Sequence, residues 1–316
     1  MKKLLCTLLS LALLLASLTA CGGKKNNPDP TDAPPPTAPA AATESPVPTQ
    51  EPAETPSPYP IAFPIGLEGS ADLDGDGEEE TICVTLSEPD EYGSCHACLS
   101  VNGEDLTAAL LSFDSVAQLN DPDELYWVVT DIDRADGVLE IAIQDLGPSD
   151  DPFTNFFRYD AGELTCLGGV PGLVYTDYAV SPLSFPGDGT IEGYLRYGVL
   201  QTWFGHASYR LNGDAFALEP AEVYYALSPQ TVTVLEPTAA RTSADETAET
   251  TTLAIGTELT LLGSDNDAWV LCAVANDKES ADELWLHLRD GGMEIETADG
   301  SYGYGWSVLD GLLFAD

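Results

Sequence analysis

The segment Asp72-Leu73-Asp74-Gly75-Asp76-Gly77-Glu78-Glu79-Glu80 sets the plan that the following part of the chain repeats. Carboxylates at alternate positions, separated by glycines, can turn several oxygens toward one hard cation, because glycine adopts the positive φ that a tight loop requires. Calcium is the cation we expect here, and the ligands expected for it are Asp72, Asp74, Asp76 and Glu80. A helical EF-hand is excluded, since its twelfth position would be Cys83, and residues 81–86 alternate like a β-strand.

Two later segments repeat this plan. The second copy runs from Asp131 to Glu140 and is one residue longer; its expected calcium ligands are Asp131, Asp133 and Asp136. The third copy, Pro186 to Glu192, keeps the Gly-Asp-Gly turn and the later Glu but has lost the leading acids, which leaves open whether it binds a metal. Each copy is followed by a strand pattern and a hairpin signal, so each unit predicts four strands around one loop, at a spacing typical of propeller blades.

Residues 61–228 thereby resemble the FG-GAP and VCBS-type repeats of integrin-like β-propellers. The resemblance rests on the loop Asp72–Glu80 and the strand after it. It implies a structural calcium ion held by the leading acids between the first two strands of a blade. A closed propeller has at least about four blades, so three units leave an open edge unless another group of strands or a partner covers it.

Residues 229–316 form a second module with short strands. Several of its segments together resemble a bacterial Src-homology-3-like barrel: Arg241-Thr242-Ser243, Ile255-Gly256-Thr257, Asp267–Val270 and Glu283–Leu286. That family often binds cell-wall peptide or glycan. Trp269 and Trp285 are expected in the core, whereas a Gly-rich segment carries the candidates for an exposed ligand platform, Tyr302, Tyr304 and Trp306. The predicted fold class is all-β: about three blade-like units and a small barrel with a C-terminal extension.

The first 60 residues predict export and anchoring. Lys2 and Lys3 precede an apolar run that ends in Leu18-Thr19-Ala20-Cys21, which resembles the signal peptide of bacterial lipoproteins. The resemblance implies removal of residues 1–20 and lipid on Cys21. A membrane-spanning helix is the alternative, but Leu4–Ala20 is at the short edge of what crosses about 30 Å of hydrocarbon. Residues 21–60 are expected to hold the lipidated Cys21 and a disordered spacer. The spacer, Pro28–Pro60, is rich in Pro, Thr and Ala and has a reach of up to about 100 Å.

The net charge of the chain argues against anionic partners. The net charge is −42, and it becomes −44 when Lys2 and Lys3 leave with the signal. From residue 61 onward 7 basic residues stand against 48 acidic ones, so nucleic acid and anionic lipid headgroups would be repelled. Most of these acids are expected to form an ordinary solvated surface.

The cysteines and histidines indicate no catalytic centre. Cys95-His96-Ala97-Cys98 has C-x-x-C spacing, but a strand turns residues three apart to opposite faces, and no second pair lies at zinc-ligand spacing. We expect small buried strand residues there, and the redox state of the cysteines stays open: Cys83, Cys95, Cys98, Cys166 and Cys272. The three histidines, His96, His206 and His287, accompany no known catalytic motif.

The sequence therefore predicts a non-catalytic lipoprotein at the bacterial cell surface, anchored to the outer face of the cell membrane. Its predicted partner is a wall component, a glycan or a surface protein, and its repeats are expected to be stabilised by calcium. An envelope enzyme or accessory subunit is the first alternative. A solute-binding lipoprotein of a transporter is the second, although it would require two α/β lobes with long helices, and only residues 106–119 permit a helix.

Overall fold

The computed structural model describes residues 57–91, 95–113, 126–145, 151–175, 182–274 and 282–315. They belong to one compact unit, Thr55–Asp316. The signal segment, Cys21 and the Pro-rich spacer lie outside the described residues. Within the described ranges, no helix is both long enough and apolar enough to cross a membrane.

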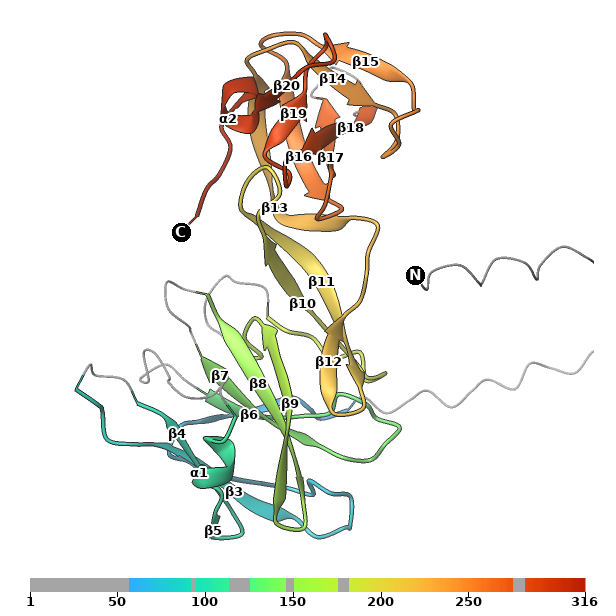
Figure 1. Cartoon of the computed structure of the whole chain (residues 1–316). Helices are drawn as coiled ribbons and strands as arrows, with labels where there is room; N and C mark the ends of the chain where they lie inside the picture. The colour runs from blue at the N-terminus through green and yellow to red at the C-terminus, as the bar shows by residue number, and fades with distance from the viewer. Residues whose placement is uncertain are drawn as a thin grey trace, which may run out of the picture. The chain divides into compact units, whose positions relative to one another are not determined.

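The first sheet is built around the strand that follows the first acidic loop. Its antiparallel order is β2 (Glu68–Ala71), β3 (Glu80–Leu86), β4 (Ala97–Val101) and β5 (Glu104–Asp105), as labelled in part in Figure 1. In β3, Ile82 and Val84 are buried, whereas Thr81 and Thr85 are exposed, as the period of two in a strand requires. The short helix α1 (Thr107–Leu110) follows β5 and buries Leu110 in the same core.

The second sheet has five strands, and its central strands are buried on both faces. Its order is β1 (Ile61–Pro64), β6 (Tyr126–Thr130), β7 (Glu140–Asp145), β8 (Phe153–Asp160) and β9 (Glu163–Pro171). In β6, Trp127 packs into the core shared with the first sheet, and the next residue, Val128, packs into the core on the other side. Burial on both faces is the reason why the sequence of β6 is apolar without alternation.

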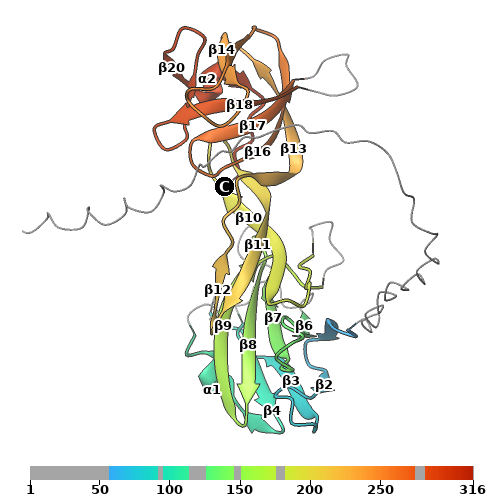
Figure 2. The same cartoon turned by 90° about the vertical axis from the view of Figure 1, so that its right-hand side faces the viewer.

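The third sheet continues without a break into the C-terminal module. It begins with β10 (Thr190–Tyr197), β11 (Trp203–Asn212) and β12 (Ala215–Leu218), and Figures 1 and 2 both place β12 beside β9. The long strand β13 (Tyr224–Val234) pairs with β11 through Gly205 and Ala226 and with β16 along most of its length. The expected boundary between residues 228 and 229 therefore falls inside one strand.

The remaining elements complete this 12-stranded sheet. They are β14 (Thr238–Arg241), β15 (Thr250–Leu253), β16 (Glu258–Ser264), β17 (Trp269–Val274), β18 (Asp282–Arg289), β19 (Glu294–Glu296), β20 (Tyr302–Tyr304) and β21 (Leu309–Asp310). The short helix α2 (Gly305–Val308) lies between β20 and β21. The all-β class is confirmed, and the sheets are antiparallel. In the described residues none of these sheets closes into a barrel.

The cysteines lie in strands or beside them. Cys95 and Cys272 are buried, and Cys83, Cys98 and Cys166 are half-buried; all five are free thiols. Burial raises the pKa of Cys272 to about 12, so this thiol is neutral and behaves as a small core residue.

Candidate functional site

The first acidic loop is held by its own glutamate. Ala71 at the end of β2 and Glu80 at the start of β3 are paired, so the loop leaves and rejoins the sheet at one point. Leu73 is fully buried, and its N–H donates to Oε2 of Glu80 at 2.9 Å. Gly75 and Gly77 have φ of 76° and 94°, which is why the turn requires glycine at both positions.

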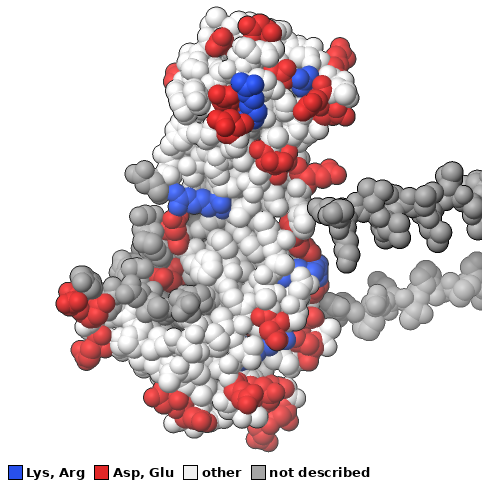
Figure 3. Space-filling view, viewed as in Figure 1, with Lys and Arg blue, Asp and Glu red and all other residues white. Residues whose placement is uncertain are grey.

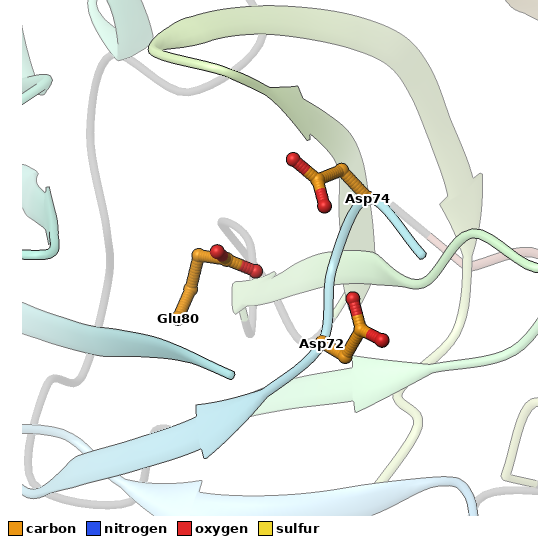
Figure 4. A group of neighbouring side chains, drawn as sticks. All are labelled: Asp72, Asp74 and Glu80. Carbon is orange, nitrogen blue, oxygen red and sulfur yellow. The ribbon is translucent and has the colours of Figure 1, made fainter. Parts of the chain in front are cut away.

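Three of the four ligands expected in this loop converge. Asp72, Asp74 and Glu80 each offer an oxygen within 4.8 Å of the others, and Figure 4 shows Glu80 facing the two aspartates. Oδ2 of Asp72 accepts the N–H of Gly77 at 3.0 Å, but its buried Oδ1 has no hydrogen-bond partner. A buried carboxylate oxygen without a partner is costly unless a cation or a donor reaches it.

Asp76, the fourth expected ligand, lies outside this converging group. It is exposed, and its Oδ1 accepts the N–H of Glu78 at 2.8 Å, so it closes a local turn. Among the ion pairs of the described residues, none brings an arginine or lysine to the first loop. The first loop therefore gathers negative charge, and no positive side chain of the described ranges pairs with it.

The second loop has the same backbone plan and a different charge balance. The N–H of Ile132 donates to Oε2 of Glu140 at 3.1 Å, as that of Leu73 does to Glu80. Here Arg158 on β8 reaches the loop, and its Nη2 lies 2.6 Å from Asp136 and 2.7 Å from Glu140. Burial raises the pKa of Glu140 to about 7, although the contact with Arg158 acts in the opposite direction.

The other two acids of the second loop face different partners. Oδ2 of Asp131 accepts the hydroxyl of Ser57 at 3.1 Å, and Oδ1 of Asp133 accepts the N–H of Ala135 at 3.0 Å. In the part of the chain that the structure describes, the only group of three converging carboxylates is that of the first loop. Calcium binding by Asp131, Asp133 and Asp136, which the sequence predicts, is not tested by these contacts.

In the third loop, Thr190 occupies the position of the glutamate that follows the first two loops. The alignment of Glu192 with that glutamate is therefore wrong. The N–H of Gly189 donates to the carbonyl of Ile132 at 3.0 Å, just as that of Leu139 donates to Leu73 at 3.0 Å. The residue after Gly189 is therefore the equivalent of Glu140. Thr190 is buried and pairs with Arg210 in the register in which Glu140 pairs with Arg158, whereas Glu192 is exposed.

Consecutive loops contact one another through these hydrogen bonds. A β-carbon on Gly75 would lie 2.6 Å from the carbonyl oxygen of Gly137, so the first two loops touch backbone to backbone. Gly75 is therefore constrained in two ways. Its φ is positive, and the carbonyl of Gly137 leaves no room for a side chain.

The aromatic residues expected as a ligand platform divide into two environments. Tyr304 and Trp306 stack with ring centroids 4.7 Å apart and an interplanar angle of 5°, and they are 47% and 54% exposed. Tyr302 instead points to His287, whose Nδ1 lies 2.9 Å from its hydroxyl, and Arg289 lies 3.9 Å from its ring centroid. The exposed pair is thus Tyr304 and Trp306.

His287 belongs to a packed and charge-balanced cluster. Its ring stacks on Trp269 at 4.5 Å, and its Nδ1 lies 3.3 Å from Oε2 of Glu296. The same oxygen accepts Nη2 of Arg241 at 2.6 Å. Trp269 is buried as expected, and Trp285 is only half-buried. His206 is exposed on β11, so the histidines do not gather at one place.

Sequence reasoning missed Arg158. Its signal in the sequence is weak, because a single arginine in an apolar strand indicates a contact only when the register of β7 and β8 is known. Comparison of the chain with models of protein families, with curated proteins and with solved structures gives no match.

Proposed function

We propose that the chain is a non-catalytic binding protein of the bacterial cell surface that holds a neutral glycan or wall component on Tyr304 and Trp306. The observation that carries the proposal is the exposed pair of rings, which stack on each other with nearly parallel planes. Exposed aromatic faces offer a rigid apolar surface that stacks on the C–H face of a sugar at little entropic cost.

The charge of the molecule favours such a ligand over an anionic polymer. Asp and Glu are spread over the face shown in Figure 3, and Lys and Arg appear at few places on it. A polyanion would be repelled by the mature chain's charge of −44, whereas an uncharged sugar would not.

In this proposal the chain is anchored by lipid, and its strands form repeats followed by a barrel-like module. Lipid on Cys21 and a spacer over residues 21–60 hold the described unit at the outer face of the membrane. The first three groups of strands are blade-like units of the FG-GAP type, and β13 to β21 form an open variant of the Src-homology-3-like arrangement. Two features support calcium in the first loop: the converging carboxylates and the unpartnered Oδ1 of Asp72.

The test is retention of the mature chain on purified cell wall and on immobilised neutral glycans. We expect Trp306→Ala and Tyr304→Ala to weaken retention at least about tenfold without a large change in melting temperature, because both side chains are exposed. The matched control is Tyr225→Ala, which removes an aromatic side chain that is 53% exposed on β13. Retention that survives the double substitution of Tyr304 and Trp306 would refute the proposed site.

A further inference from the structure

The first two loops correspond position by position, despite the extra residue in the second. In each, the second residue of the loop donates its N–H to the glutamate that begins the next strand: Leu73 to Glu80 and Ile132 to Glu140. In each, an aspartate accepts the N–H two residues later: Asp76 from Glu78 at 2.8 Å and Asp136 from Val138 at 3.0 Å. Asp136 and Glu140 are therefore the counterparts of Asp76 and Glu80.

The counterparts differ in what faces them. Nε and Nη2 of Arg158 donate to Oε1 of Glu140 at 2.9 and 2.7 Å, and Nη2 also donates to Oδ2 of Asp136 at 2.6 Å. The side chain of Glu140 is fully buried, and those of Arg158 and Asp136 are 24% and 30% exposed. This is a forked, charge-assisted contact that is largely shielded from water.

Among the described residues of the first sheet, no side chain supplies such a contact from the same place. There the ladder of β3 and β4 ends at Ile82 and Val101, and the chain then turns from β4 into β5 at Asn102 and Gly103. Oδ1 of Asn102 accepts the N–H of Thr81 at 2.9 Å. In the third sheet, Arg210 stands at the corresponding register position, but its partner is Thr190, and its Nε donates to Glu219 at 2.5 Å. The arginine–glutamate pair inside a loop is thus specific to the second unit.

We propose that Arg158 is the built-in cation of the second loop, and that this loop therefore takes no divalent ion. A divalent cation would have to displace the guanidinium from two carboxylates, and the displaced charge would remain beside it. The inference deepens the proposed calcium binding of the first loop: it assigns the metal to one loop and a side chain to the other.

The first test measures calcium stoichiometry on the full mature chain at pH 8 by equilibrium dialysis. We expect Asp133→Asn to leave calcium binding unchanged, because Asp133 belongs to the loop that holds Arg158. Asp74→Asn, the matched substitution in the first loop, should remove the bound calcium. Loss of one equivalent of calcium in Asp133→Asn would overturn the assignment.

The second test needs no metal and therefore separates this inference from the proposed calcium site. At pH 8 in excess chelator, Arg158→Gln should lower the melting temperature by at least about 5 °C, because the ionised Glu140 is left buried without its partner. Arg210→Gln, at the corresponding position of the third sheet, should lower it much less, since the side chains of Arg210 and Glu219 are 41% and 38% exposed. Equal effects of the two substitutions would overturn the role of Arg158, even if the wild type bound no calcium at all.

Discussion

At Asp72 one carboxylate oxygen is buried without a partner, although the other oxygen is well bonded. Glu80 is also buried, and only the N–H of Leu73 reaches its Oε2 among the hydrogen bonds of the described loop. Repulsion among Asp72, Asp74 and Glu80 therefore opposes folding, and a cation bound between them would relieve it.

The first prediction concerns the stabilisation that calcium gives through this loop. Extracellular calcium sites have dissociation constants of roughly 0.1 to 1 mM, so a few millimolar calcium should add about 1 to 2 kcal/mol to the free energy of unfolding. Asp74→Asn should abolish this gain, and Asp76→Asn should retain most of it, because Asp76 lies outside the converging group and asparagine can still accept the N–H of Glu78. Thermal melts with calcium and with chelator measure the gain, and a wild type that is indifferent to both would contradict the prediction.

The second prediction concerns the pH dependence that Glu140 contributes. Its pKa in the folded chain is about 7, raised by burial from 4.5. Between these values the folded state holds a proton that the unfolded state has released, so the contribution of Glu140 to stability is complete below pH 4.5 and is lost as pH rises toward 7. Relative to Glu140→Gln, the wild type should lose stability between pH 4.5 and 8, by at most about 3 kcal/mol.

Urea denaturation at pH 5 and pH 8 measures this difference. The exposed Glu192→Gln controls for the loss of one negative charge. A difference between wild type and Glu140→Gln that is constant across this range, or that grows with pH, would show that Arg158 and not burial governs the carboxyl group.

The carboxylates of the first loop could be predicted from their spacing, because alternate acids and glycines fix a turn by local geometry. The charge state of the second loop could not be predicted in the same way. Whether Asp136 and Glu140 face water, a metal or a guanidinium depends on Arg158, which is brought there by strand register. The alignment of Glu192 with Glu140 is wrong for a similar reason. The position of the third loop is decided by the backbone hydrogen bond between Ile132 and Gly189, which the sequence does not show.

At the scale of elements, a glycine in β2 lies where the first sheet packs against the second. The rings of Phe63 on β1 and Trp127 on β6 stack with centroids 4.3 Å apart. Gly69 of β2 lies against both rings: a β-carbon there would be 2.7 Å from atoms of each. The absence of a side chain at Gly69 lets the first sheet approach the stacked pair.

The third prediction follows from this packing. Gly69→Ala should destabilise the chain by about 1 to 3 kcal/mol, because the ring of Trp127 is fully buried and the ring of Phe63 stacks on it, so that making room for a methyl group disturbs both. Gly198→Ala is the matched control, since nothing lies within 4 Å of a β-carbon at that position. Chemical denaturation measures both variants, and an equal effect of the two would show that the rings yield freely.

The strands themselves followed from their composition, whereas their grouping did not. The sequence predicts a new module from residue 229 onward, next to a proline, which cannot donate in a ladder. In the structure β13 passes through Pro229, and its pairing with β16 shifts register between Tyr225 and Gln230. A bulge removes the need for the missing N–H, so the strand continues where the sequence indicates an end.

At the scale of the whole molecule, this continuity joins the modules energetically. The core cluster that contains Val128 and Phe156 of the second sheet also contains Trp203 on β11 and Leu261 on β16. A second cluster joins the first and second sheets, with Leu99 on one side and Phe157 on the other. The second sheet takes part in both clusters. Loss of packing in the first sheet or in the C-terminal module therefore exposes apolar surface of the second sheet.

The last prediction is that residues 57–315 unfold in one cooperative transition. Leu99→Ala, in the first sheet, and Leu261→Ala, in the C-terminal module, remove side chains of the same size that are 1% and 0% exposed. Each should cost about 2 to 5 kcal/mol and shift the same calorimetric transition, because the cores they weaken share the second sheet. Two transitions, each moved by only one of the substitutions, would show instead that β13 is a connection between independent domains. In that case a fragment starting at residue 229 would fold alone; with one transition it should not, because it lacks the part of β13 in which Tyr224 and Tyr225 pair with Ser264 and Gly263.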